Sequence, residues 1–163
     1  MAVVYRIAAA GPAWDEMDLR GLGAKAAGGR WNSVGVPMVY TASSISLAVL
    51  ETVVHLGAGV FPMNRYIIEI EIPDGDFAKR KVVAPAALPP AWDSNPASFK
   101  SAQFGDAWIR ATSGLVLSVP SVVVPPERNL LLNPGHPAMS GVKARNLGKY
   151  VYDTRTIGSL KKP

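Results

Sequence analysis

The 163-residue chain contains no cysteine and only two histidines, His55 and His136. Without cysteine the chain can form neither disulfide bonds nor thiolate zinc sites. The histidines do not stand in a metal-binding spacing such as H-x-x-x-H or H-E-x-x-H. We therefore expect no metal site. The lack of cysteine also fits a protein of the reducing cytoplasm.

The sequence also lacks long apolar runs and the common catalytic or phosphate-binding motifs. No stretch reaches the roughly 18 consecutive apolar residues that a membrane span needs, and the first residues carry no basic segment typical of a signal peptide. The glycine-rich stretch 21–30 matches neither G-x-G-x-x-G nor G-x-x-x-x-G-K-[ST], and G-x-S-x-G is absent. We expect a soluble, unexported protein whose chemistry needs neither a metal nor an activated side-chain nucleophile.

The composition is that of one globular domain spanning 1–163, with 48% hydrophobic and 18% charged residues. The net charge is +5, and the basic residues are dispersed apart from short runs at 79–81 and 161–162, which we expect to lie in a solvated loop and tail. Such a surface favours an anionic ligand or an acidic protein partner. A non-catalytic module that binds nucleic acid or a protein remains an alternative, although no nucleic-acid motif is present and basic residues do not cluster with aromatic ones.

Alternation of apolar and polar residues predicts more strand than helix. Segment 65–72 alternates most clearly, with isoleucines on one face and two glutamates on the other. Pro120 interrupts an apolar run and suggests an edge strand or a bulge there. The segments expected to contain strands are 3–8, 29–32, 37–42, 65–72, 113–126 and 149–156, with a loop or short strand at 127–137.

Two helices are expected in the same way. The first runs over 44–56, with Ser43 or Ser44 as its N-cap and Gly57 after its end. The second covers 99–112 and is weakened by Gly105. Segments 9–29 and 73–98 should be mainly loop. The predicted fold class is α+β.

Glu51 lies on the first helix, which is apolar nearly all round and should be buried. A buried carboxylate costs several kcal/mol unless it is paired or protonated. Glu51 therefore either pairs with Arg30 or reaches the surface at a helix edge, or it lines a cleft in which a nearby cation stabilises its ionised form.

Arg30 and Tyr40 indicate which kind of ligand this cleft could bind. Arg30 follows two glycines that permit close backbone approach, and a guanidinium binds diphosphates and carboxylates well. Tyr40 offers a ring for stacking and a hydroxyl for hydrogen bonding, although it can equally be a tyrosine of the sheet core. Trp31 should face the core, opposite Arg30. A carboxylate, an anion-binding group and a flat ring together would suit a dinucleotide.

At these residues the sequence resembles the RES-domain family, which is named for arginine, glutamate and serine positions. The resemblance covers nearly the whole chain, through "YRI" near the start, "GLGAKAAGGRWNSVGVPMVYTASSISLAVLE", "VPSVVVPPERNLLLNPGHP" and a final "YDTR". It implies a toxin of a bacterial toxin–antitoxin pair whose antitoxin partner is an Xre-like helix-turn-helix protein. It also implies an ADP-ribosyltransferase-like fold, with a split β-sheet core flanked by a few helices around an NAD cleft.

The resemblance assigns roles that the residues alone do not. Arg30, Glu51 and Ser121 would be the family's arginine, glutamate and serine. Arg30, Tyr40 and Glu51 look like a variant of the histidine–tyrosine–glutamate arrangement of diphtheria-type transferases, with arginine in place of histidine. The weaker matches, Arg6 and Asn129, join Ser121 as expected NAD-binding residues.

The chemistry implied is cleavage of the nicotinamide–ribose bond of NAD. We expect Glu51 to stabilise the positive charge that develops on the sugar, Arg30 to hold the diphosphate or the adenosine-side ribose, and Tyr40 to stack on nicotinamide. The ADP-ribose acceptor stays open. A protein acceptor, favoured by the fold analogy, would make the chain a mono-ADP-ribosyltransferase, whereas water or phosphate would make it an NAD-depleting toxin.

Overall fold

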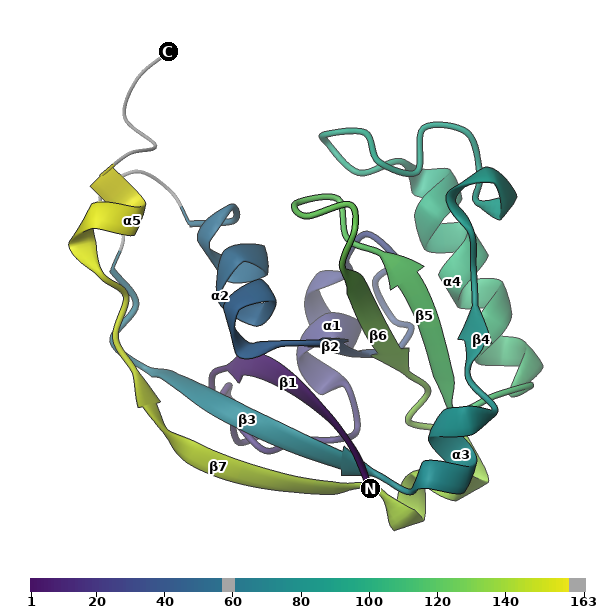
Figure 1. Ribbon diagram of the computed structural model, residues 1–163, viewed down its shortest axis with the longest axis horizontal. Helices are drawn as coiled ribbons and strands as arrows, with labels where there is room; N and C mark the ends of the chain where they lie inside the picture. The colour runs from purple at the N-terminus through teal and green to yellow at the C-terminus, as the bar shows by residue number, and fades with distance from the viewer. Residues whose placement is uncertain (57–60, 159–163) are drawn as a thin grey trace.

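A computed structural model describes residues 1–56 and 61–158 (Figure 1). The strands are β1 (Ala2–Ala8), β2 (Val39–Ala42), β3 (Arg65–Ile72), β4 (Lys81–Val82), β5 (Val116–Pro120), β6 (Arg128–Leu132) and β7 (Lys143–Tyr150). The helices are α1 (Leu22–Ala27), α2 (Ile45–Val53), α3 (Asp74–Ala78), α4 (Phe99–Ala111) and α5 (Thr154–Gly158), with 3-10 turns η1 (Pro85–Ala87) and η2 (Pro137–Gly141). The helix end predicted at Gly57 and the basic pair 161–162 lie outside the described residues.

The strands form one sheet in the order β4-β5-β6-β2-β1-β3-β7. β4 and β5 run parallel, and the other neighbouring pairs are antiparallel. β1 and β2 share a single registered pair, Tyr5 with Ala42, whereas β1 is in register with β3 from Ala2 to Ala8. The sheet therefore divides between β2 and β1 into a β6 half (β4, β5, β6, β2) and a β3 half (β1, β3, β7), as Figure 1 shows. The α+β class and the split sheet expected from the sequence are confirmed.

The β6 half is covered on both faces, which explains its continuous apolar sequence. Leu117 and Leu131 pack with Trp108 of α4, while Val116 and Leu130 belong to the cluster on the other face. The interpretation of this run as an edge strand is wrong, because β5 lies between β4 and β6. Pro120 is tolerated since it is the last residue of the strand, where a missing N–H interrupts no ladder.

The β3 half shows the alternation that the sequence predicts. Ile68, Ile70 and Ile72 have no exposed surface and join the main core cluster. Glu69 and Glu71 point to the opposite face, where Glu69 is covered by its ion pair with Arg145 of β7. β3 thus buries Ile68, Ile70 and Ile72 on one face and carries its glutamates on the other, which is the arrangement that period-two alternation indicates.

Three local predictions need correction or refinement. Residues 29–32 form a tight turn closed by a bridge between Gly29 and Asn32, not a strand. The last strand is β7, and the segment after Asp153 is helical because Asp153 caps the first turn of α5, accepting from the backbone N–H of Arg155. α2 begins at the predicted N-cap, where Ser44 Oγ accepts from Leu47 N at 3.1 Å, but ends at residue 53.

Gly105 has a packing function in α4 that the sequence does not reveal. A Cβ at this position would lie 1.8 Å from the carbonyl oxygen of Trp31. The predicted helix forms, and its glycine lets it approach the 29–32 turn closely. Trp31 is in the core as predicted, 2% exposed and stacked on Trp92.

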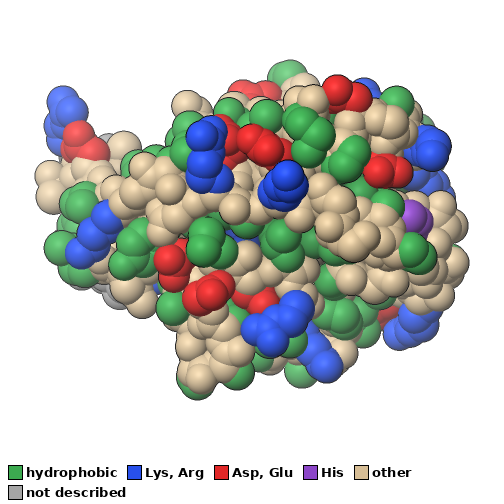
Figure 2. All heavy atoms as spheres, turned by 90° about the horizontal axis from the view of Figure 1, so that it is seen from below, with side chains coloured by type: hydrophobic (Ala, Val, Ile, Leu, Met, Phe, Trp, Pro, Cys, Tyr) green, Lys and Arg blue, Asp and Glu red, His purple; other side chains and the backbone are tan. Residues whose placement is uncertain are grey.

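The surface carries charges of both signs. On the face shown in Figure 2, Lys and Arg side chains lie among Asp and Glu side chains. Lys79 and Lys81, from the predicted solvated run, are exposed at the end of α3 and the start of β4. Within the described residues no helix is long and apolar enough to cross a membrane.

Candidate functional site

A pocket of about 880 Å³ opens where the two halves of the sheet separate. Its walls come from β1, β2, α2, the start of β6, the 28–31 turn, and the loop segments 95–97 and 122–123. This volume lies in the upper range for small-molecule sites. Five of the six residues singled out in the sequence line it: Arg6, Arg30, Tyr40, Glu51 and Asn129.

Helix α2 brings Glu51 to this pocket. Leu47 and Ala48 pack against Tyr5 and Ile7 of β1, so the helix stands over the junction of the two halves (Figure 1). The helix is not buried all round as its sequence suggested. Leu50 is 41% exposed, and Glu51 lies partly buried between the packed side and the open side.

One oxygen of Glu51 is held and the other is free. Oε1 accepts hydrogen bonds from Ser121 Oγ at 2.7 Å and Asn129 Nδ2 at 2.6 Å. Oε2 has no hydrogen-bond partner in the described part of the chain. Ser121 is fully buried and is not part of the pocket wall, and its Oγ also accepts from the backbone N–H groups of Val123 and Val124. The structure thus places Ser121 against Glu51 and not on the pocket wall.

Arg30 lies at the tip of the 29–32 turn and binds the loop across from it. Its Nη1 donates to the carbonyl oxygens of Trp92 at 2.7 Å and Ser94 at 2.9 Å. Among the described residues the ion pairs include none between Arg30 and Glu51. Burial lowers the pKa of Arg30, opposed by the carboxylates of Glu51 and Asp93. Arg30 and Glu51 thus interact across the pocket without contact, and of the alternatives for Glu51 the structure shows the cleft-lining one.

Tyr40 contributes its ring to the pocket, but its hydroxyl is already engaged. The hydroxyl donates to Asn32 Oδ1 at 2.7 Å and accepts from Trp31 N at 2.9 Å. Gly29 is required beside it, because a Cβ there would lie 2.7 Å from the hydroxyl oxygen. Burial raises the pKa of Tyr40, so the hydroxyl stays protonated. Tyr40 therefore fits both interpretations, since it packs against a core cluster and also lines the pocket.

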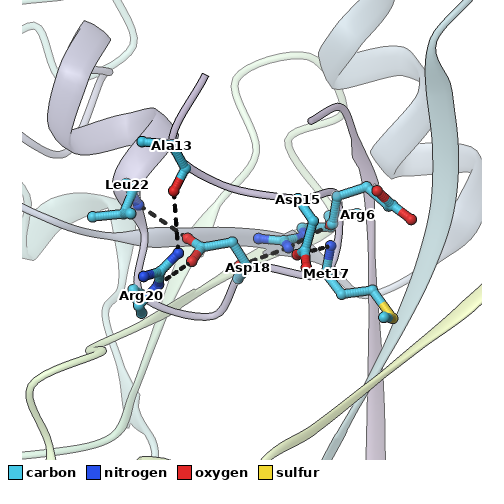
Figure 3. Close-up of polar contacts among 8 residues, drawn as sticks. Arg6, Ala13, Asp15, Met17, Asp18, Arg20 and Leu22 are labelled. Atoms are coloured by element: carbon cyan, nitrogen blue, oxygen red, sulfur yellow. Dashed lines mark hydrogen bonds and ion pairs between the residues drawn. The ribbon is translucent and has the colours of Figure 1, made fainter. Parts of the chain in front are cut away.

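Arg6 enters the pocket from β1. Its Nη2 donates to the carbonyl oxygens of Glu16 and Asp18, at 2.8 and 2.7 Å (Figure 3). Its Nε is buried without a partner among the described residues. Burial lowers the pKa of Arg6, opposed by the carboxylates of Asp18 and Asp15. Asp18 also accepts from Leu22 N at the start of α1, so Arg6 ties this segment to the pocket wall.

The chain matches the model of the RES domain over residues 3–153. It belongs to the RES-domain family. The "Prs ADP-ribosylating toxin" of Sphingobium sp. is 51% identical over 153 residues, covering 94% of this chain and 95% of that protein. "Toxin Res" of Yersinia enterocolitica is 42% identical over 116 residues, covering 71% and 74%. The family recognised in the sequence is confirmed.

A solved structure shares its fold with nearly the whole chain. The chain from the crystal structure of the M. tuberculosis MbcT–MbcA toxin–antitoxin complex superposes with a TM-score of 0.62, covering 98% of this chain and 88% of that one. The identity is 16%, so this likeness concerns the fold.

The sequence did not point to some of the residues that line the pocket. Asn95, Pro96 and Ala97 form part of its wall, but they lie in a proline-rich stretch whose position depends on the distant Arg30. His55, in the turn that follows α2, also lines the pocket, and its position four residues after Glu51 was a usable signal. No group of three or more His, Cys, Asp or Glu side chains suited to a metal occurs within residues 1–56 and 61–158.

Proposed function

We propose that this RES-domain protein is a toxin that cleaves NAD at the nicotinamide–ribose bond and transfers ADP-ribose to a protein. The observation that carries the proposal is the state of Glu51 in the pocket: Ser121 and Asn129 hold one carboxylate oxygen, and the other has no partner in the described chain. The free oxygen belongs to a carboxylate in a pocket large enough for a dinucleotide, with two arginines in its wall.

Glu51 supplies electrostatic stabilisation in this proposal. When the C1′–N bond breaks, the nicotinamide ring takes the bonding electrons and leaves as a neutral molecule, and positive charge develops on the ribose. The carboxylate of Glu51, fixed in place before the reaction, stabilises that charge and accepts a hydrogen bond from a ribose hydroxyl. In this proposal the reaction needs neither a metal nor a side-chain nucleophile of this chain.

Arg30 and Arg6 bind the anionic part of the substrate. Nη2 and Nε of Arg30 have no hydrogen-bond partner in the described residues, and neither does Nε of Arg6. Guanidinium groups with free N–H donors are suited to diphosphate oxygens. Tyr40 presents its ring to the nicotinamide, while its engaged hydroxyl keeps the ring in a fixed orientation.

A protein acceptor is supported by the Sphingobium relative, whose name describes a toxin that ADP-ribosylates Prs. At 51% identity over 94% of this chain, Prs is the first acceptor to test. We also propose an antitoxin partner, since the similar M. tuberculosis fold was solved as a toxin–antitoxin complex, and from the family resemblance we expect an Xre-like protein. The cytoplasm is the expected place of action, because NAD and protein targets are found there.

The test is incubation of the purified protein with NAD, alone, with purified Prs, and with bacterial lysate, followed by mass spectrometry of small molecules and proteins. We expect free nicotinamide together with a protein whose mass increases by one ADP-ribose. Nicotinamide release with free ADP-ribose or its phosphorylated form, and no modified protein, would instead establish an NAD-depleting toxin. Unchanged NAD in every reaction would refute both forms of the proposal.

A further inference from the structure

The side chain of Asn129 is satisfied at one end and unsatisfied at the other. Nδ2 donates to Glu51 Oε1 at 2.6 Å. Oδ1 is buried and has no hydrogen-bond partner among the described residues. The orientation of the amide is determined by Glu51, because turning it over would place two acceptor oxygens against each other. A buried acceptor without a partner is uncommon in a folded protein and indicates a missing donor.

Ser121 provides a comparison within the same cluster. It also donates to Glu51 Oε1, at 2.7 Å, but its oxygen accepts from Val123 N and Val124 N at 3.0 Å each. Ser121 is fully buried behind Glu51, whereas Asn129 is part of the pocket wall. Both residues hold Glu51, but the oxygen of Ser121 already accepts two hydrogen bonds, whereas Oδ1 of Asn129 accepts none from the described residues.

The two unused acceptors form a pair. Glu51 Oε2 and Asn129 Oδ1 belong to side chains that are hydrogen-bonded to each other and line the same pocket. Two acceptors on side chains that are hydrogen-bonded to each other suit the two adjacent hydroxyls that the nicotinamide ribose of NAD carries at C2′ and C3′. Glu51 acts best next to C1′, where charge develops, and so takes the 2′-hydroxyl. The 3′-hydroxyl is then the one that faces the amide.

We propose that Asn129 is a specificity-determining residue that accepts a hydrogen bond from the 3′-hydroxyl of the nicotinamide ribose through Oδ1, while its Nδ2 positions Glu51. Ser121 is a positioning residue that acts through Glu51 alone. This inference rests on the proposed cleavage of NAD. It assigns different roles to two residues that lie in the same cluster and contact the same carboxylate oxygen.

The experiment compares NAD with its analogue lacking the 3′-hydroxyl on the nicotinamide ribose. Nicotinamide release gives kcat/KM for both compounds with the wild type, Asn129→Ala and the matched control Ser121→Ala, each checked for folding by thermal melting. We expect the wild type to prefer NAD by roughly three- to tenfold, the worth of one neutral hydrogen bond. Both variants should be slower on NAD, but Asn129→Ala should lose the preference and Ser121→Ala should keep it.

Several results would overturn the assignment. If Asn129→Ala folds poorly, the wild type alone decides, because a wild type that cleaves both compounds equally does not recognise the 3′-hydroxyl. If Asn129→Ala keeps the preference for NAD over the analogue, Asn129 does not recognise the 3′-hydroxyl. If both variants lose the preference equally, their effect on it passes through Glu51. A wild type that cleaves neither compound would refute the proposed function itself, so the two failures are distinguishable.

Discussion

The two sides of the pocket use their polar groups differently. On the acid side, formed by Glu51, Ser121 and Asn129, one carboxylate oxygen is held and the other is left without a partner in the described chain. On the turn side, Nη1 of Arg30 and the hydroxyl of Tyr40 are both occupied by hydrogen bonds to other parts of the chain. The turn side thus determines the shape of the pocket and contributes to folding stability, and we propose that the acid side carries out the chemistry.

The largest effect should come from the acid side. Glu51→Gln keeps an acceptor oxygen for Ser121 and Asn129 but removes the charge, so NAD cleavage should fall by roughly 100- to 1000-fold with little change in melting temperature. Glu127→Gln is the matched control, since Glu127 contacts Ser44 and is not part of the pocket wall. Near-normal turnover by Glu51→Gln would refute the proposed role of Glu51.

Arg30→Ala should affect both binding and stability, because Arg30 holds the loop carbonyls of Trp92 and Ser94. We expect KM for NAD to rise by roughly 10- to 100-fold, as for loss of a charged hydrogen-bonding group, together with a lower melting temperature. Arg110→Ala, which removes an exposed arginine of α4, should change neither quantity. An Arg30→Ala protein with normal stability would contradict the structural part of this role.

Tyr40→Phe should distinguish the contribution of Tyr40 to folding stability from its contribution to the reaction. The ring remains, but Asn32 Oδ1 and Trp31 N lose their partner, which should lower the free energy of unfolding by about 1–3 kcal/mol. Below the melting transition, kcat/KM should change by less than roughly threefold if only the ring contacts the substrate. Tyr66→Phe is the control, because no hydrogen bond of the Tyr66 hydroxyl occurs among the described residues. Denaturant unfolding and nicotinamide release measure the two effects, and a large loss of kcat/KM would show that the hydroxyl acts in the reaction.

The smallest effect is expected behind α2. The Tyr152 hydroxyl donates to Thr52 Oγ1 at 2.7 Å, so Tyr152→Phe should cost about 0.5–1.5 kcal/mol of unfolding free energy and reduce activity slightly. Tyr150→Phe is the matched control: its ring packs edge-on against Tyr152, and no hydrogen bond of its hydroxyl is found in the described chain. Equal melting temperatures for the two variants would show that this hydrogen bond does not support the helix.

The sequence predicts those parts of the fold that depend on local pattern. The alternation of β3 could be predicted because the strand itself places glutamates on one face and buried isoleucines on the other, and the N-cap at Ser44 because capping is local. The position of β5 was not readable, since its second neighbour, β4, is a two-residue parallel strand with exposed side chains. Long-range pairing of this kind leaves no periodic signal in either segment.

The candidate site divides in the same way. Glu51 could be selected from the sequence because a carboxylate on an apolar helix needs an explanation. Ser121 could be selected only through the family resemblance, and the structure shows why: its partner is 70 positions away. Arg30 was selected for its chemistry, but its two carbonyl partners lie 62 and 64 positions away and could not be predicted.

The hydrogen bonds to Glu51 also have a consequence for the protein's biosynthesis. The acid emerges from the ribosome early, whereas the serine and asparagine that fix it follow 70 and 78 positions later. Tyr152, which supports the back of the same helix, follows later still. A nascent or prematurely terminated chain that lacks these residues therefore has no assembled site.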